Sequence, residues 1–349
     1  MLRLLFLGSI SAILGNATPK ISAEYLFEEF LAVFGKGYGA FDDNDRLKRF
    51  EVFSANLDKI EELNANDAHA QYSHLTPWAD LTNTEFTSMH GLDSPSMICQ
   101  FATPPPKLKP TAVPKSSIDY VALGATVAVK NQGKCASCWA HASTAVVEGR
   151  LKLDTGHITS LSEQYLMDCD SARVCKGCCG GLGERTLQWL ASPHTPGIAS
   201  EEQYPYASAS GNDPTSKHCN KTCPLVAAVK GFGQVQGDSA SMLAASTEYG
   251  ILSVAMDSSV LQFYKSGVIT AVENCSTVTS NHQVAIVGYG TSEGVDFWKV
   301  RNSYGSEFGE QGYFRIERSS GDEAAPCGMS GCVTAVTGAA YIPSSSRSD

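Results

Sequence analysis

The first third of the chain repeats its apolar residues with the spacing of amphipathic helices. Between Ile21 and Asn64 apolar side chains recur every three or four positions, and the glycine-rich segment Gly35–Gly39 interrupts them. This pattern predicts two helices joined by a turn. A short segment around Tyr72–Phe86 follows, and Phe101–Pro114 is then too rich in proline for a helix or a central strand. We interpret this last segment as a linker.

The part of the chain after Pro114 begins with helical patterns and then becomes rich in strands. Ser137–Leu153 has a helical pattern that Asp154-Thr155-Gly156 ends, and a second helix is expected near Ser162–Asp168. Four later runs are rich in β-branched and aromatic residues and are bounded by glycine, which predicts strands. They are Ile251–Met256, Gln283–Val287, Phe297–Val300 and Tyr313–Ile316.

Composition and charge narrow the class of protein. The chain has 349 residues, of which 43% are hydrophobic and 18% charged, as in ordinary globular proteins. Its net charge is −10, and neither side of Pro114 is positively charged overall. Because binding to nucleic acid requires a basic surface, we expect no nucleic-acid partner.

The N-terminus has the features of a secretory signal peptide. Arg3 precedes the apolar run Leu4–Gly15, and small residues stand at the positions expected for cleavage after Ala17. The alternative, a membrane anchor, requires about 20 apolar residues, and no run of that length exists in the chain. Twelve cysteines, all but Cys99 after Pro114, agree with an oxidising compartment. Asn220 and Asn274 begin possible N-glycosylation sequons.

Cys138 is the candidate nucleophile. It begins the first turn of a predicted helix, where peptide dipoles and unpaired N–H groups favour the thiolate. A nucleophilic cysteine needs an imidazole to take its proton and a third group to orient the imidazole. His282 opens an apolar strand, and Asn302 follows it by 20 residues. From composition alone, Cys138 could equally be half of a disulfide.

At these residues the chain resembles the papain-like cysteine peptidases, specifically the cathepsin L-like members. The similarity extends over the whole chain after the linker, through Gln132-Gly133-Lys134-Cys135-Ala136-Ser137-Cys138-Trp139, Leu161-Ser162-Glu163-Gln164, Gly177-Cys178-Cys179-Gly180-Gly181 and Asn302-Ser303-Tyr304-Gly305. It implies a two-lobe α+β fold, with a helical lobe and an antiparallel, barrel-like β lobe that enclose a cleft.

The N-terminal part resembles the inhibitory propeptide of the same family. Its helical signature matches at Arg49, Phe53, Asn56, Ile60 and Asn64, with Asp45 in place of the initial Glu. Of a second pattern, read at His74, Thr76, Trp78 and Asp80, only Asp80 matches outright, while Trp78 keeps an aromatic ring. The resemblance implies a signal peptide at 1–17, an inhibitory propeptide at 18–100, a linker at 101–113 and a peptidase domain at 114–349.

The resemblance assigns the catalytic roles residue by residue. Cys138 is the nucleophile, His282 the general acid and base, and Asn302 the acceptor that orients the imidazole. The side-chain amide of Gln132 and the backbone N–H of Cys138 form the oxyanion hole. Four positions depart from the usual pattern, and they bear on the rate and the substrate preference. They are Ala136 for glycine, His141 for phenylalanine, Tyr304 for tryptophan and Gln283 for a small residue.

The resemblance also implies disulfides and a substrate pocket. The implied disulfides are Cys135–Cys178, Cys169–Cys219 (or Cys223 in place of Cys219) and Cys275–Cys327. Cys175, Cys179, Cys223 and Cys332 are left over. Two spacings, Cys175-x2-Cys178 and Cys219-x3-Cys223, superficially suggest a zinc site, which we weigh as a lesser alternative. The pocket for the side chain two residues before the scissile bond would be lined by the uncharged residues Cys332, Ala255, Gly183, Leu182 and Gln283. Cys332 leaves the pocket if it is disulfide-bonded.

The expected function is that of a secreted or endolysosomal cysteine endopeptidase made as a zymogen. We expect no metal or other cofactor, protein and peptide substrates, inhibition by its own propeptide, no membrane anchor and a monomer. No long insert resembles the occluding loop of the family's carboxydipeptidases, which favours an endopeptidase. A catalytically silent homologue that acts as a binding protein is the alternative.

Overall fold

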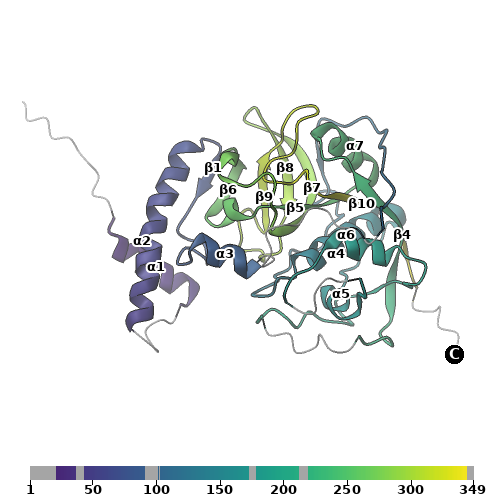
Figure 1. Ribbon diagram of the computed structural model, residues 1–349, viewed down its shortest axis with the longest axis horizontal. Helices are drawn as coiled ribbons and strands as arrows, with labels where there is room; N and C mark the ends of the chain where they lie inside the picture. Colours follow the sequence, from purple (N-terminus) through teal and green to yellow (C-terminus); the bar gives the residue numbers. More distant parts are fainter. Residues whose placement is uncertain are drawn as a thin grey trace, which may run out of the picture.

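The computed structural model describes residues 21–36, 43–90, 101, 103–172, 178–211 and 219–343. The expected signal peptide therefore lies outside the described residues. Figure 1 shows the N-terminal helices on one side of the molecule, a twisted sheet in the middle and a group of helices on the far side.

The two predicted N-terminal helices are confirmed. They are α1 (Ala23–Phe34) and α2 (Asp43–Asn66), which cross each other (Figure 1). The Ser22 hydroxyl accepts a hydrogen bond from the backbone N–H of Tyr25 and caps α1, and Gly35 ends it with φ 60°, a conformation that glycine adopts readily. Buried phenylalanine side chains join the helices, with ring centroids of Phe27 and Phe30 each 5.2 Å from that of Phe53.

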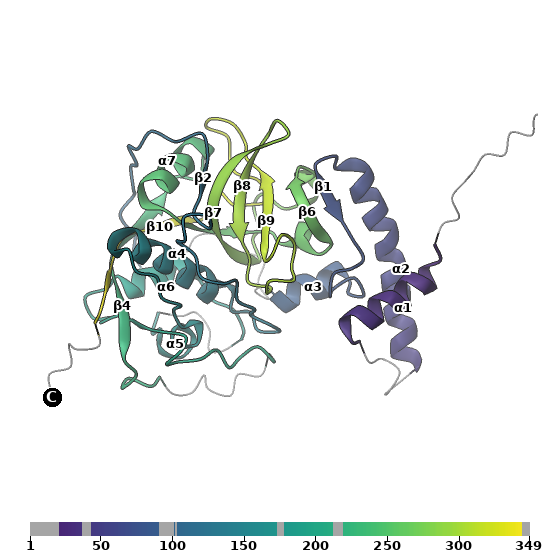
Figure 2. The same ribbon diagram turned by 180° about the vertical axis from the view of Figure 1, so that it is seen from behind.

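The segment after α2 attaches this part to the rest of the chain. Strand β1 (Ala70–Tyr72) pairs antiparallel with β6 (Tyr264–Ile269), so the N-terminal region extends the sheet of the C-terminal part. Helix α3 (Asn83–His90) follows and lies below β1 and β6 in Figure 1; Figure 2 shows the same neighbourhood from behind. The N-terminal region is therefore docked on one edge of the sheet.

The helical lobe is built around α4 (Cys138–Thr155) and α5 (Glu163–Cys169), both of which the sequence predicts. Helix α4 is buried along most of its length, and Gly156 ends it in the left-handed region with φ 75°. Helix α6 (Gly183–Leu190) packs against α4 and was not predicted, because its glycine-rich entry masks the helical pattern. Helix α7 (Ser239–Tyr249) lies at the far end of the sheet, near β10 and β5.

The sheet contains the four predicted strands and two long ones that the sequence did not reveal. The predicted strands are β5 (Leu252–Met256), β7 (His282–Ser292), β8 (Val295–Arg301) and β9 (Tyr313–Glu317). The two missed strands, β4 (Leu225–Val235) and β10 (Val333–Tyr341), pair with each other. Their many glycine and alanine residues have low strand propensity, and pairing across the sheet overrides it. Short strands β2 (Ile118–Asp119) and β3 (Ile198–Ala199), and 3-10 turns at Ser259–Leu261 and Val272–Asn274, complete the elements.

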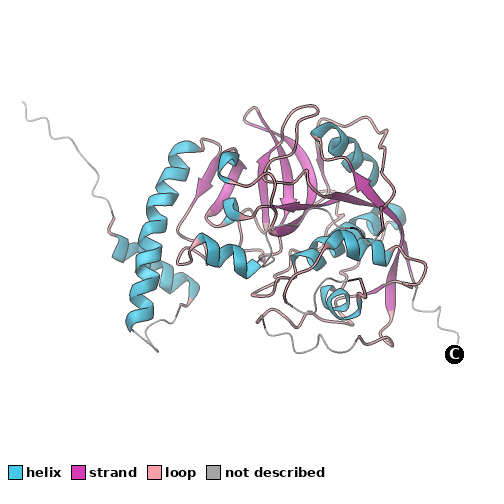
Figure 3. Cartoon of the chain, in the orientation of Figure 1, coloured by secondary structure: helices cyan, strands magenta, loops and turns pink. Residues whose placement is uncertain are grey.

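The expected α+β fold, with a helical lobe and a mainly antiparallel, barrel-like β lobe, is confirmed, but the sheet that the structure describes is not closed. Among the described residues the strands follow an open path, β1-β6-β9-β8-β7-β5-β10-β4-β3, with β2 paired to β7. Closure requires the end strands to pair, but one end is the N-terminal β1 and the other is β3, which follows the helices. The pair β6 and β9 is also parallel. Figure 3 shows the resulting segregation of helices and strands expected of an α+β fold.

The proline-rich segment lies along β4. The carbonyl of Pro106 accepts a hydrogen bond from the N–H of Gln234 at 2.9 Å, and the N–H of Leu108 donates to the carbonyl of Gln234 at 2.8 Å. This isolated bridge is the only strand-like contact of residues 103–113 among those described. The segment is an extended connector, as its proline content predicts.

Candidate active site

Cys138 is the first residue of α4, with Ser137 at the helix N-cap. Its thiol is reduced, which excludes the alternative that it is half of a disulfide. The side chain is 1% exposed. The structure thus places a reduced cysteine at the positive end of a long helix, as the sequence predicts.

Burial reverses the expected effect of the helix on this thiol. Burial raises the pKa of Cys138 to about 11, although the backbone N–H groups of Gln283, Trp139 and Cys138 itself act to lower it. The charged thiolate loses more by leaving water than it gains from these donors. Burial therefore favours the protonated thiol over the thiolate at Cys138.

His282 and Asn302 meet at the ends of neighbouring strands. His282 begins β7, and Asn302 follows the last residue of β8, its antiparallel neighbour. The Nε2 atom of His282 lies 2.9 Å from Oδ1 of Asn302. That oxygen also accepts a hydrogen bond from the N–H of Ser303 at 2.8 Å, which fixes the amide, so Nε2 is the donor. Tyr304 stacks on the imidazole, with centroids 4.9 Å apart and ring planes inclined by 29°.

Gln132 is fully buried in the loop before α4. Its Nε2 donates to the carbonyl of Cys135 at 2.9 Å, and its Oε1 accepts a hydrogen bond from the Ser303 hydroxyl. The amide is thereby held between the Cys138 loop and the residue after Asn302. One N–H of the side chain is used by Cys135, and the amide carries a second. The catalytic candidates in the helical lobe and in the sheet are connected through this residue.

The three disulfides implied by the resemblance are present. Cys135 is bonded to Cys178, Cys169 to Cys219 and Cys275 to Cys327. Cys223 keeps its thiol, so it does not replace Cys219. The zinc alternative fails, because a sulfur in a disulfide is not a thiolate ligand and both spacings use such cysteines. The sequence left the partner of Cys175 open, and Cys175 lies outside the described residues.

The substrate pocket differs from the one expected. Cys332 is in a disulfide, as is Cys179, which is the condition under which we expect Cys332 to leave the pocket. The structure does bring Gly183, Ala255 and Gln283 together, because Ala255 pairs with Gln283 across β5 and β7 and Gly183 donates to the Gln283 side chain. Leu182 caps α6 beside them. All are almost fully buried, and the Gln283 side chain fills the space between them.

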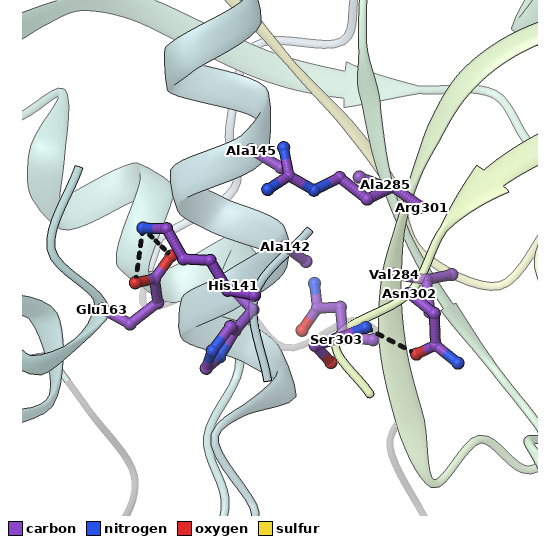
Figure 4. Close-up of a pocket in the computed structure, with 11 residues that line it drawn as sticks. His141, Ala142, Ala145, Glu163, Val284, Ala285, Arg301, Asn302 and Ser303 are labelled. Carbon is purple, nitrogen blue, oxygen red and sulfur yellow. Dashed lines mark hydrogen bonds and ion pairs between the residues drawn. The ribbon is translucent and has the colours of Figure 1, made fainter. Parts of the chain in front are cut away.

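A buried group of charges lies between the lobes and was not recognised from the sequence. The ammonium of Lys130 lies 2.8 Å from the carboxylate of Glu163, and Arg301 lies 3.5 Å from that of Glu148. Figure 4 shows the adjoining pocket, with His141 and Glu163 on the helical side and Ala285 and Arg301 on the strands. These residues stand inside or beside the quoted motifs, but nothing in their spacing shows that they meet.

His141 lies at this pocket and is buried. Burial lowers the pKa of its imidazole, and its Nδ1 lies 3.0 Å from the carbonyl of Ser137, one turn earlier in α4. Its ring packs edge-on against Tyr206, with centroids 5.2 Å apart. The histidine therefore occupies the interior position that an aromatic residue would take.

The N-terminal region contacts the sheet beside the candidate site. Trp78 packs on Tyr304, which covers His282, with ring centroids 5.1 Å apart. Gln262 donates to the carbonyls of Trp78 and Leu81 at 3.1 and 2.7 Å. Asp80, by contrast, is paired with Lys36 at 3.2 Å, entirely within the N-terminal region.

The carboxylate that crosses between the two parts is Asp67, which the sequence did not single out. It accepts hydrogen bonds from the hydroxyl and N–H of Thr270 at 2.7 and 2.9 Å, and from the N–H of Ala271 at 3.2 Å. No motif contains it, so only the pairing of β1 with β6 reveals the contact.

Comparisons with known proteins agree with this arrangement. Residues 114–337 match the model of the papain family cysteine proteases, and residues 27–86 match that of the cathepsin propeptide inhibitor domain (I29). Fruit bromelain of Ananas comosus is 35% identical over 308 residues, which cover 87% of this chain and 83% of the relative.

Solved structures of precursor forms are similar over most of the chain. A recombinant stem bromelain precursor superposes with a TM-score of 0.76 at 31% identity, covering 90% of this chain and 99% of the other. Digestive procathepsin L 3 from the Tenebrio molitor larval midgut superposes with a TM-score of 0.72 at 29% identity, covering 90% of this chain and 99% of the other. The proform of the ragweed pollen allergen Amb a 11 has the same TM-score and identity, covering 90% of this chain and 92% of the other.

Proposed function

The chain belongs to the papain family of cysteine proteases and carries the propeptide of a zymogen, and from this membership we propose which residues perform the hydrolysis. Cys138 is the nucleophile, His282 the general acid and base, Asn302 the group that orients the imidazole, and Gln132 an oxyanion donor. The observation that carries the proposal is the 2.9 Å contact of His282 Nε2 with Asn302 Oδ1, beside the helix that begins with a reduced cysteine.

The first half of the reaction follows from these contacts. Because Asn302 holds Nε2, the other ring nitrogen of His282 takes the proton of the Cys138 thiol. The thiolate attacks the peptide carbonyl and forms a tetrahedral intermediate. The backbone N–H of Cys138 and the side-chain amide of Gln132 donate to its oxyanion. The imidazolium then protonates the leaving amine, and an acyl-enzyme remains.

Water completes the reaction. The imidazole of His282 takes a proton from a water molecule, whose oxygen attacks the thioester, and a second tetrahedral intermediate uses the same oxyanion donors. Its collapse releases the acid and returns the proton to Cys138. Tyr304, stacked on the imidazole, keeps water away from the bond to Asn302.

Activation must expose the thiol. The raised pKa of Cys138 has burial as its main cause, so a thiol that regains contact with solvent and with the imidazolium ionises more readily. We propose that residues 18–100 act as the inhibitor, that 101–113 is the activation segment and that the mature enzyme starts near Thr111–Ser117. The side chain of Val113 is 86% exposed, which supports access of a protease to this segment.

We propose the secretory route as the location, with delivery to the exterior or to a lysosome-like or vacuolar compartment, and a monomer as the active form. The three disulfides support an oxidising compartment. None of the helices in the described part of the chain is long and apolar enough to cross a bilayer.

Irreversible labelling tests the catalytic assignment. A vinyl-sulfone or epoxide probe should label acid-processed protein at Cys138, and Cys138→Ala should abolish both labelling and peptide hydrolysis while the fold persists. Cys223→Ala is the matched control, since it removes the other described reduced and buried thiol. Full hydrolysis by Cys138→Ala would reject the assignment, and labelling without hydrolysis in the unmodified chain would favour a silent homologue.

A further inference from the structure

The side chain of Gln283, the residue after His282, connects the two lobes. Gln283 follows His282 on β7. Its Oε1 accepts a hydrogen bond from the N–H of Gly183 at 2.9 Å, at the start of α6, and its Nε2 donates to the hydroxyl of Ser253 on β5 at 3.0 Å. Gln283 is only 3% exposed, so both bonds are made away from water.

The absence of a side chain at Gly183 leaves room for the amide of Gln283. A Cβ atom added there would lie 2.6 Å from Nε2 of Gln283 and 2.9 Å from its Oε1, closer than real Cβ contacts. Its backbone needs no left-handed conformation, so the close approach of the amide is what favours glycine. The side-chain amide of Gln283 therefore packs directly against the backbone of Gly183, and both its oxygen and its nitrogen form hydrogen bonds.

The same residue also contacts the thiol. The backbone N–H of Gln283 is one of the donors that stabilise the ionised form of Cys138. Gln283 thus touches α6 of the helical lobe, β5 of the sheet and the sulfur at the start of α4. Gln283 is also among the residues that line the pocket drawn in Figure 4, whose charged and titratable members are Lys130, His141, Glu163 and Arg301.

We propose that Gln283 is a positioning residue that holds Cys138 and His282 in register across the lobe interface. The inference rests on the proposed function, in which those two residues react with each other. Cys138 stands on a helix of one lobe and His282 on a strand of the other, so a small movement of α6 and α4 relative to β7 changes their separation. Such misplacement is expensive in catalysis, since a shift of about 1 Å can lower a rate by about a hundredfold.

The first test removes the hydrogen bonds and keeps the volume. In the full chain, processed at acid pH, Gln283→Met should lower kcat about tenfold or more and change KM less than about twofold, because the loss affects alignment of the reacting groups. The apparent pKa for alkylation of Cys138 by iodoacetamide should rise. The thiolate is stabilised by a nearby imidazolium and by the backbone N–H of Gln283, and the variant keeps both groups but loses the side-chain bonds that hold them in place. The matched control is Gln164→Met, a buried glutamine that bonds to Asp168, Ala207 and Ser208 within the helical lobe.

Two further variants keep the proposal testable if Gln283→Met does not fold. Gly183→Ala pushes on the amide from the helical side, and Ser253→Ala removes only the sheet-side bond. Both should shift the alkylation profile in the same direction by a smaller amount. An unchanged profile and kcat in folded Gln283→Met, or equal effects in Gln164→Met, would overturn the inference. Failure of the proposed function is distinct, because the unmodified processed chain would then neither hydrolyse peptides nor be alkylated at Cys138.

Discussion

Asp67 offers a sharp test of how the propeptide is held. Its carboxylate is 2% exposed and accepts hydrogen bonds from Tyr72 on its own side and from Thr270 and Ala271 of the peptidase domain. Burial raises the pKa of Asp67, but the hydrogen bonds from Thr270, Ala271 and His69 outweigh burial and leave the pKa below its usual value. The ionised carboxylate is therefore part of the closed zymogen.

The informative change is Asp67→Asn, which keeps the shape. One carboxylate oxygen becomes an NH₂ group. Both oxygens of Asp67 accept hydrogen bonds, so in either orientation of the new amide its NH₂ group faces hydrogen-bond donors. On the Oδ2 side these are the hydroxyl of Tyr72 and the N–H groups of Thr270 and Ala271. A hydrogen bond to a charged group contributes about 1.5–3 kcal/mol, so losing one or two gives about 3 kcal/mol. This free energy corresponds to about a hundredfold larger open fraction of the zymogen.

The assay is the rate at which a vinyl-sulfone probe labels Cys138 in uncleaved zymogen at pH 7, since labelling requires opening. Asp67→Asn should be labelled about a hundredfold faster than the unmodified chain. Asp45→Asn is the control, because Asp45 is an exposed carboxylate on α2. Equal labelling of Asp67→Asn and Asp45→Asn would refute the reasoning.

The pH dependence has a definite sign. Since the pKa of Asp67 is lower in the closed state, its contribution to closure is complete above the pKa of the open state, about 3.9, and is lost as the pH falls through the lower closed-state value. Labelling of the unmodified zymogen should therefore accelerate below about pH 4. Labelling of the Asp67→Asn zymogen should lack the acceleration that comes from protonation of Asp67.

Three other outcomes are expected. His282→Ala should be nearly as inactive as Cys138→Ala, while Asn302→Ala should retain more kcat because it loses orientation and keeps proton transfer; equal losses would contradict the assigned roles. N-terminal sequencing of acid-processed protein should find a start near Thr111–Ser117, and a start before Leu81 would contradict the propeptide boundary. Fluorogenic dipeptides with Leu, Val or Phe at the second position should be cleaved faster than those with Arg. The residues expected to line the pocket for this side chain are uncharged, so an Arg would lose its hydration without meeting a carboxylate.

Much of the local structure was determined by sequence pattern alone. The spacing of apolar residues predicted α1, α2, α4 and α5, and β-branched runs predicted β5, β7, β8 and β9. The order of short motifs was enough to identify the family, and the family resemblance implied the disulfides, with Cys219 or Cys223 left open as the partner of Cys169. These features are local, or depend on residues whose identity the chemistry restricts, so they can be read along the chain.

Only the tertiary structure decided the pKa of the candidate nucleophile and the long-range contacts around the site. The helix terminus at Cys138 predicts an acidic thiol, but burial raises its pKa, and burial depends on the whole fold. Gln283 meets Gly183 across 100 positions, and Asp67 meets Thr270 across 203. The strands β4 and β10 are likewise stabilised by each other rather than by their own composition. Desolvation and contacts between distant segments are properties of the packed chain, and no local pattern records them.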